Sequence, residues 1–225
     1  MLLKLTDVSK SYKSLYGRII RDVLRGADFA VEKGEKIAVA GPSGSGKTTL
    51  LNLAGALDFP DKGEIYFNGE PLSGMDASQL AAFRNRKIGF IFQFHHLLPQ
   101  LTLWENILIP ALPGNEGDTE VHRRARELLT ETGLWDIRHQ KPGELSGGEC
   151  QRTAVVRALI NDPSLILADE PTGSLDNENA SMLIDLLIRL NGKEESGMVV
   201  VTHSMEIASR MDKIYKIRDG KLEEG

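Results

Sequence analysis

The sequence predicts a single α/β domain in which short buried strands alternate with helices, and three observations support this fold class. Apolar runs of four to six residues have the length of buried strands rather than helices. Leucines recur at helical spacing in segments between these runs. The chain has 225 residues, 41% of them hydrophobic and 26% charged, which suits one packed globular core. The runs occupy residues 36–40, 87–92, 164–168 and 198–201.

In the first part of the chain, the residue pattern predicts antiparallel strands at the edge of a sheet, followed by a buried strand. Apolar and polar residues alternate in two early segments, as expected of half-buried strands, and a mostly apolar run follows them. A glycine-rich turn begins at Gly41, and a leucine-rich segment with helical spacing comes after it. The expected order is strand 2–8, strand 27–31, strand 36–40, helix 48–57, strand 63–68 and strand 87–92.

The middle of the chain predicts a mostly helical insertion over 102–132, interrupted by a loop at 113–115 and stopped near Gly133. After it we expect helix 149–161, strand 164–168, helix 177–190, strand 198–201 and a hairpin over 213–222 that turns at Asp219 and Gly220. Residues 1–225 are therefore expected to form one domain. Its core and β subdomain would comprise 1–92 and 156–225, and its helical subdomain 93–155.

Charge and cysteine content exclude some classes of protein. The chain carries 27 Lys and Arg against 32 Asp and Glu, a net charge of −5, which disfavours binding to nucleic acid. A single cysteine, Cys150, cannot form an internal disulfide and favours a reducing compartment. The sequence contains neither a signal-peptide stretch nor an apolar run of about 18 residues. We therefore expect a cytosolic chain that relies on other subunits to cross any membrane.

The glycine-rich turn matches the phosphate-loop pattern G-x-x-x-x-G-K-[ST] in its required strand, loop and helix context. Glycines allow successive backbone N–H groups to surround phosphate oxygens, and the following helix presents its positive end to the same anion. Lys47 is expected to reach the β- and γ-phosphates of ATP, and Thr48 to offer its hydroxyl to Mg²⁺. The alternative is a tight turn that only caps a helix. The predicted nucleotide-binding residues here are Gly41, Pro42, Ser43, Gly44, Ser45, Gly46, Lys47, Thr48 and Thr49.

An acidic pair follows the apolar run at 164–168. Ligands of open α/β sheets bind at the carboxyl ends of the strands, which is where Asp169 and Glu170 are expected. Asp169 is the candidate for holding Mg²⁺, and Glu170 for polarising the attacking water as general base. The alternative is a strand end with two solvated carboxylates.

A second glycine-containing turn, Ser146, Gly147, Gly148 and Glu149, opens the predicted helix at 149–161. It forms another array of N–H groups at a positive helix end, and so a candidate second phosphate site. Because the chain has one phosphate loop, this turn could serve the nucleotide of another copy. We expect an ATP-dependent homodimer in which two chains pack head to tail around two ATP molecules. The alternative is an ordinary helix N-cap.

The order of these motifs resembles that of the nucleotide-binding domains of ABC transporters over essentially the whole chain. The matching features are the phosphate loop, Gln93 after an apolar strand, the Ser146 turn, the acidic pair, Ser174-Leu175-Asp176 and His203. The resemblance implies a P-loop NTPase (RecA-like) core with an N-terminal antiparallel β subdomain and an inserted helical subdomain. It implies an ATPase with ATP and Mg²⁺ as cofactors.

The same resemblance implies roles for single residues. Tyr12 would stack on adenine, and Gln93 would contact Mg²⁺ or the attacking water and sense a membrane partner. Ser146 and Gly148 would touch the γ-phosphate of the opposite nucleotide, residues 174–176 would communicate across the dimer, and His203 would hold the γ-phosphate. Tyr12 could instead be a packing aromatic, and His203 a neutral structural histidine.

The stretches 92–99 and 101–106 are similar to the ATPase of the bacterial lipoprotein-releasing complex, the LolD branch of the family, and less closely to the MacB efflux and FtsE cell-division ATPases. This implies integral membrane partner subunits, a peripheral position on the cytoplasmic face of the inner membrane, and no direct contact with the transported substrate. The apolar residues here could form a docking surface or fill the helical subdomain. They are Phe94, Leu97, Leu98, Leu101, Leu103 and Trp104.

Two alternatives lie outside transport. A soluble ABC-type ATPase of DNA repair or translation is disfavoured by the acidic composition and by the absence of a coiled-coil insertion and of a second nucleotide-binding half. A nucleotide-binding module without turnover is disfavoured by the presence of Asp169, Glu170 and His203 together.

Overall fold

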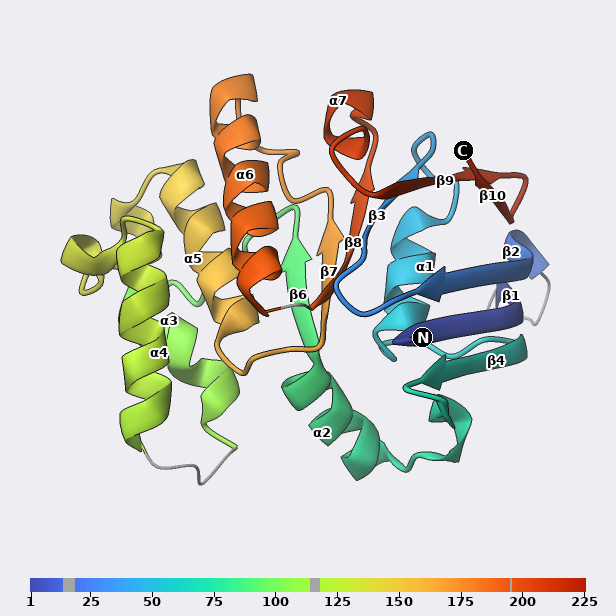
Figure 1. Cartoon of the computed structure of the whole chain (residues 1–225), viewed down its shortest axis with the longest axis horizontal. Helices are drawn as coiled ribbons and strands as arrows, with labels where there is room; N and C mark the ends of the chain where they lie inside the picture. Colours follow the sequence, from blue (N-terminus) through green and yellow to red (C-terminus); the bar gives the residue numbers. More distant parts are fainter. Residues whose placement is uncertain (14–18, 114–117, 195) are drawn as a thin grey trace.

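The structure is a computed structural model that describes residues 1–13, 19–113, 118–194 and 196–225. It contains a four-stranded sheet in the order β2-β1-β4-β5 and a six-stranded sheet in the order β10-β9-β3-β8-β7-β6. Figure 1 shows the small sheet at one end of the molecule and helices α3, α4 and α5 at the other. The large sheet lies between them.

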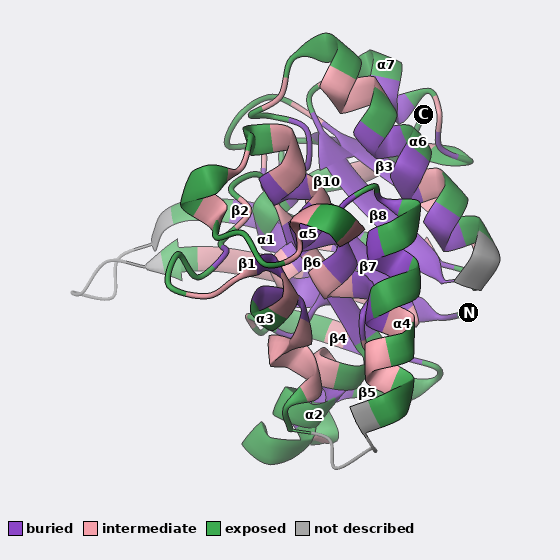
Figure 2. Ribbon diagram, turned by 90° about the vertical axis from the view of Figure 1, so that its left-hand side faces the viewer, coloured by how far each residue is buried: buried purple, intermediate pink, exposed green. Residues whose placement is uncertain are grey.

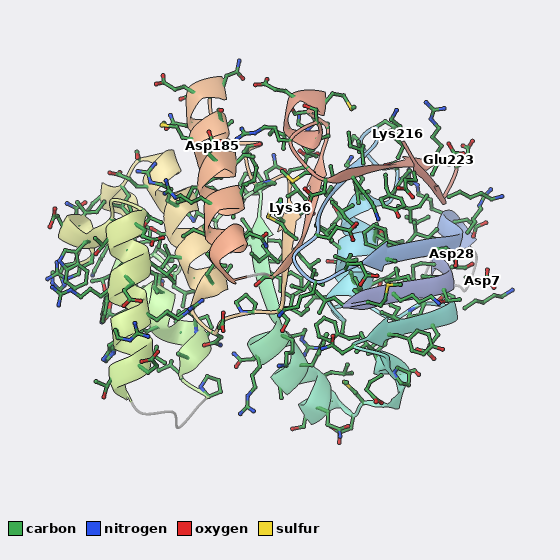
Figure 3. All side chains as sticks on the ribbon, in the orientation of Figure 1. Asp7, Asp28, Lys36, Asp185, Lys216 and Glu223 are labelled. Atoms are coloured by element: carbon green, nitrogen blue, oxygen red, sulfur yellow. The ribbon has the colours of Figure 1, made fainter. Side chains whose placement is uncertain are left out.

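The small sheet is antiparallel and comprises β1 (Leu3–Lys13), β2 (Ile19–Val31), β4 (Lys62–Phe67) and β5 (Glu70–Pro71). Strand β1 is its centre, because Leu3 pairs with Val31 on one side and with Phe67 on the other. Asp7 and Asp28, labelled in Figure 3, lie together on β1 and β2, where the Asp7 N–H donates to Asp28 Oδ1 at 3.0 Å.

The large sheet is parallel except for its last strand, β10, which pairs antiparallel with β9. Its central strands are buried on both faces, which explains why they appear in the sequence as continuous apolar runs. Because these strands are parallel, their carboxyl ends meet at one edge of the sheet. The strands are β3 (Lys36–Ala40), β6 (Ile88–Phe92), β7 (Leu165–Asp169), β8 (Gly197–Thr202), β9 (Lys213–Arg218) and β10 (Lys221–Glu224).

The helices connect these strands. The α-helices are α1 (Lys47–Ala54), α2 (Ala77–Lys87), α3 (Leu103–Leu108), α4 (Asp118–Glu131), α5 (Gly147–Leu159), α6 (Asn177–Glu194) and α7 (Met205–Ala208). Short 3₁₀ turns are η1 (Leu72–Gly74), η2 (Ile109–Ala111), η3 (Trp135–Ile137) and η4 (Pro142–Glu144). None of the helices within the described ranges is long and apolar enough to cross a membrane.

Two hydrophobic clusters cover the two faces of the large sheet. On β7, Leu165 and Leu167 pack with α1 and the small sheet, whereas Ile166 and Ala168 pack with the helices on the opposite face. This alternation is the period of two expected for a strand. Helix α1 is therefore enclosed between the two sheets, and Figure 2 shows the central strands of the large sheet in the purple of buried residues.

The predicted elements differ from the observed ones in a few places. Helix α1 ends at Ala54 rather than at residue 57, because Gly55 caps it and Ala56 adopts a left-handed φ of 53°. Helices α2 and α7 were not predicted. The loop expected at 113–115 lies largely outside the described residues. Leu97 and Leu103 are buried, so these two follow the alternative in which they fill the interior, whereas Phe94 and Leu98 are exposed.

Candidate functional site

The phosphate-loop sequence, residues 41–48, connects β3 to α1. Gly46 is the N-cap of α1 with a φ of 110°, a backbone conformation that favours glycine. Lys47 is only 7% exposed, and its Nζ donates to the carbonyl oxygens of Gly41 at 2.8 Å and Pro42 at 3.1 Å. The lysine therefore lies across its own loop, within reach of an anion bound by the loop's N–H groups.

The outer side of this loop borders a hollow of about 500 Å³. Pro42, Ser43 and Gly44 are exposed there, and Ser45 is half-buried. The guanidinium of Arg21, at the start of β2, donates to the carbonyl oxygen of Gly44. Arg21 was not predicted as a site residue, and it places a positive charge directly against the loop.

Tyr12 and Arg21 are paired across β1 and β2, so both side chains lie on the same face of the small sheet. The Tyr12 hydroxyl lies 3.3 Å from Thr49 Oγ1 on α1 and 3.3 Å from Asp58 Oδ2, and Lys10 forms an ion pair with Asp58 at 2.6 Å. Tyr12 remains 41% exposed. Its ring is therefore anchored beside α1 and still open to a ligand.

The structure brings the phosphate loop and the acidic pair together. Asp169 ends β7, where it pairs with Phe92 of β6 and Val201 of β8, and the Thr48 side chain lies near its carboxylate. Burial raises the pKa of Asp169 above its ordinary value, and Glu170 adds to this shift, whereas the Thr48 hydroxyl and the charge of Lys47 oppose it. A bound cation would stabilise this buried carboxylate in its charged form.

Glu170 lies directly beside His203 at the same edge. The Glu170 backbone has a φ of 45°, and its N–H donates to Val201 O at 2.9 Å. Glu170 Oε2 lies 2.9 Å from Nδ1 of His203, with side-chain exposures of 16% for the glutamate and 72% for the histidine. A carboxylate held in this way can accept a proton from a water molecule on its open side.

Gln93 follows β6 at the next strand end and is exposed. A Cβ on Gly173 would lie 2.9 Å from Gln93 Nε2, so the amide rests against the loop after β7. The Ser174 hydroxyl donates to Gln93 O at 3.4 Å, and Asp176 caps α6 by accepting from Asn179 N at 2.9 Å. The loops that carry Gln93 and Ser174 are thus in contact.

The Ser146 turn forms a capping box at the start of α5. Ser146 Oγ accepts from Glu149 N at 3.3 Å, and Glu149 Oε2 accepts from Ser146 N at 2.8 Å. The Ser146 hydroxyl, which donates to Glu149 Oε2 at 2.7 Å, and the Ser146 N–H together lower the pKa of the Glu149 carboxyl. Gly147 and Gly148 begin the helix, and no hydrogen bond or ion pair between described residues joins this turn to the phosphate loop of the same chain.

Comparison with known proteins decides the family. The sequence matches the ABC transporter family over residues 24–173. The chain belongs to this family. It is an ABC ATPase, and its fold is the ATP-binding cassette predicted from the motif order.

Solved structures extend the match to the whole cassette. The dimeric ATP-binding cassette MJ0796 in a post-hydrolysis state with ADP and Pi is 38% identical, with a TM-score of 0.89, over 100% of this chain and 98% of that one. A second dimeric structure of MJ0796, described as a bacterial ABC transporter cassette, is 39% identical over 99% and 97% with the same TM-score. CbiO1 from Clostridium perfringens, part of the transporter complex CbiONQ, shares the fold, with 24% identity, a TM-score of 0.88 and coverage of 100% and 88%.

In this cassette, Asn106 holds the segment after Gln93 in shape. Its buried side chain donates to the carbonyl oxygens of Leu98, Leu101 and Thr102 and accepts from Leu98 N at 2.8 Å. The segment therefore has a fixed conformation although it lies outside the strands and α-helices, and it presents Phe94, which is 66% exposed, to the surface.

We expect Asn106→Leu to lower the free energy of unfolding by about 2–4 kcal/mol, because it leaves several backbone groups without a partner. Denaturant unfolding measures the loss. Asn85→Leu is the control and should cost about 1 kcal/mol, because it removes a bond to Pro110 O, which keeps a bond from Asn161, and a long bond of 3.4 Å from Asn161. Equal losses in the two variants would contradict the role given to Asn106.

Proposed function

We propose that this cassette hydrolyses Mg²⁺-bound ATP between two copies of itself and so drives membrane subunits that release lipoproteins from the bacterial inner membrane. The catalytic part rests on the contact between Glu170 and His203, with the Thr48 side chain near the neighbouring Asp169. This arrangement places the phosphate loop beside a carboxylate cluster at one sheet edge.

The donors at this edge fit a magnesium ion. Mg²⁺ prefers oxygen ligands, and the Thr48 hydroxyl and the Asp169 carboxylate provide them beside the phosphate loop, with Gln93 as a further candidate. The ion would neutralise charge on the transferred phosphoryl group. Lys47 contacts the β- and γ-phosphates, and Tyr12 stacks on the adenine.

Glu170 is the proposed general base, which takes a proton from the attacking water. His203 orients the Glu170 carboxylate through its ring nitrogen and contacts the γ-phosphate. Ser174 and Gln93 connect this centre to the neighbouring loop. Each residue of this set is at the carboxyl end of a parallel strand or in the loop that follows it, as ligand sites of α/β sheets require.

The Ser146 turn is proposed to serve the nucleotide of a second copy. It makes no direct bond to its own phosphate loop among the described residues, and its exposed N–H groups at the start of α5 suit an anion. The solved structures of MJ0796 are dimeric, which supports a two-copy arrangement for the present chain as well. ATP binding would then favour the closed dimer, and hydrolysis would reopen it.

The proposed membrane partners contact the helical subdomain, residues 93–155, which moves against the core formed by 1–92 and 156–225. Exposed Phe94 and Leu98 suit the apolar side chains of such a partner. The lipoprotein cargo rests on the similarity of residues 92–106 to the LolD branch, and a MacB-like efflux or FtsE-like division complex is the second candidate. The chain would work at the cytoplasmic face of the inner membrane without touching the cargo.

An affinity capture tests the cargo and the partners. We expect tagged Glu170→Gln with ATP to recover, from detergent-solubilised bacterial membranes, subunits with few membrane spans and a large periplasmic domain, together with lipoproteins identified by mass spectrometry. The Lys47→Ala variant, which should bind ATP far more weakly, is the control for nucleotide-dependent capture. Recovery of efflux or division subunits instead would overturn lipoprotein release and leave the ATPase intact.

A further inference from the structure

Helix α5 holds the backbone on both sides of Gln93. Gln151 Nε2 donates to the carbonyl oxygen of Phe92, the residue before Gln93, at 2.9 Å. On the other side, the Arg157 guanidinium donates to His95 O and His96 O, each at 2.7 Å. Two side chains from one helix therefore hold the segment 92–96.

Arg157 is partly buried, and its hydrogen bonds go to these two backbone carbonyls. Burial lowers the pKa of Arg157, and no carboxylate among the described residues lies within ion-pair distance of it. Its two hydrogen bonds are charge-assisted and therefore stronger than neutral ones. Both acceptors are backbone carbonyls, so Arg157 fixes the path of the chain rather than a particular side chain.

The geometry of the held segment depends on these bonds. His96 has a φ of 48°, which is unfavourable for a residue with a side chain and needs support from its surroundings. His95 Nδ1 accepts from Leu97 N at 3.2 Å, and burial, followed by the charges of Arg157 and His96, lowers the pKa of His95.

Gln151 makes the matching contact from inside the protein. Its side chain is 1% exposed, and its Oε1 has no hydrogen-bond partner in the described structure. A buried amide with only one of its two ends hydrogen-bonded costs free energy, and the single bond that Gln151 makes is the one to Phe92. That bond fixes the end of β6 directly before Gln93.

We infer that Gln151 and Arg157 are positioning residues that fasten the segment 92–96 to α5 and so set the position of Gln93 beside Ser174. The inference rests on the proposed function of Gln93.

The first test compares two arginines of like chemistry. Arg157→Lys keeps the positive charge and loses the planar guanidinium. Arg124→Lys is the control: it makes the same change at a guanidinium that donates to Leu159 O at 2.9 and 3.1 Å, away from Gln93. We expect Arg157→Lys to lower the kcat of ATP hydrolysis about tenfold with an unchanged KM for ATP, because misplacement of a catalytic group reduces the chemical step. Arg124→Lys should leave kcat unchanged, although it should change Tm about as much as Arg157→Lys does.

The deciding test is a double-mutant cycle with Gln93→Ala. If Arg157 acts through Gln93, Arg157→Lys reduces kcat no further in the Gln93→Ala background. A full additional loss there would overturn the inference while leaving the role of Gln93 intact. Normal turnover of Gln93→Ala alone would refute the proposed role of Gln93, and the inference with it.

Gln151→Leu provides a second route to the same conclusion if Arg157→Lys unfolds. It removes the bond to Phe92 O while keeping the volume of a buried side chain. We expect the same fall in kcat, again absent in the Gln93→Ala background. Unchanged kcat in both single variants, with normal Tm, would overturn the inference.

Discussion

We expect Glu170→Gln to bind ATP with unchanged affinity and to hydrolyse it about 10²–10⁴ times more slowly than the natural protein, the range typical for loss of general base catalysis. Glutamine has the shape of glutamate and can still meet Nδ1 of His203, which now lies 2.9 Å from the carboxylate. The variant loses only the ability to accept a proton. Phosphate release under saturating ATP gives kcat, and equilibrium titration gives the affinity.

Glu35→Gln is the matched control for this prediction. Glu35 is a similarly shielded carboxylate, with a side-chain exposure of 12%, and it pairs with Lys213 at 2.7 Å beyond the amino end of β3. Its replacement should change stability rather than turnover. The proposed role of Glu170 is wrong if Glu170→Gln retains about a tenth or more of the natural kcat, a loss smaller than general base catalysis provides.

The sheet was predictable because each central strand is buried on both faces. Such strands must be apolar over their whole length, as in residues 164–168, and the sequence shows this directly. Helix α2 was not predicted, because its apolar face consists only of Leu80 and Phe83. Its start does have a sequence signature, the capping box between Asp76 and Gln79. A short amphipathic helix on a largely polar segment gives a weak periodic signal.

The residues that meet at the sheet edge were predictable for a different reason. Parallel strands end at the same edge, so Gln93, Asp169 and the loop that carries His203 had to be neighbours once the strands were recognised. Their motifs each follow a strand in the sequence.

The supporting contacts could not be predicted in this way. Arg21 reaches Gly44 only because of the register between β1 and β2, and Arg157 reaches His95 only because of the path of the chain after Gln93. In both contacts the acceptor is a backbone carbonyl. Every residue has a backbone carbonyl, so residue types do not indicate which carbonyl the arginine will contact. The contact can be identified only in the folded structure.

We expect Lys47→Ala to lose ATP affinity by about 10²–10⁴-fold, because each charge-assisted hydrogen bond to phosphate contributes about 1.5–3 kcal/mol and the lysine is placed to make two. Lys47 is buried and already spans the loop from Gly41 O to Pro42 O, so its charge lies where the phosphates would bind. Lys36, at the other end of β3 and labelled in Figure 3, forms an ion pair with Asp212 at 3.1 Å. Lys36→Ala should leave the affinity unchanged.

Thermal unfolding separates lost binding from lost stability. A ligand stabilises the folded state in proportion to the logarithm of its concentration over its Kd, so a concentration 100 times the Kd adds about 2.7 kcal/mol. ATP should therefore raise the Tm of the natural protein and of Lys36→Ala, and leave that of Lys47→Ala almost unchanged at the same concentration. If ATP raises the Tm of Lys47→Ala as much as that of the natural protein, Lys47 does not hold the phosphates, and the nucleotide must be bound chiefly by the backbone of the loop and by Tyr12.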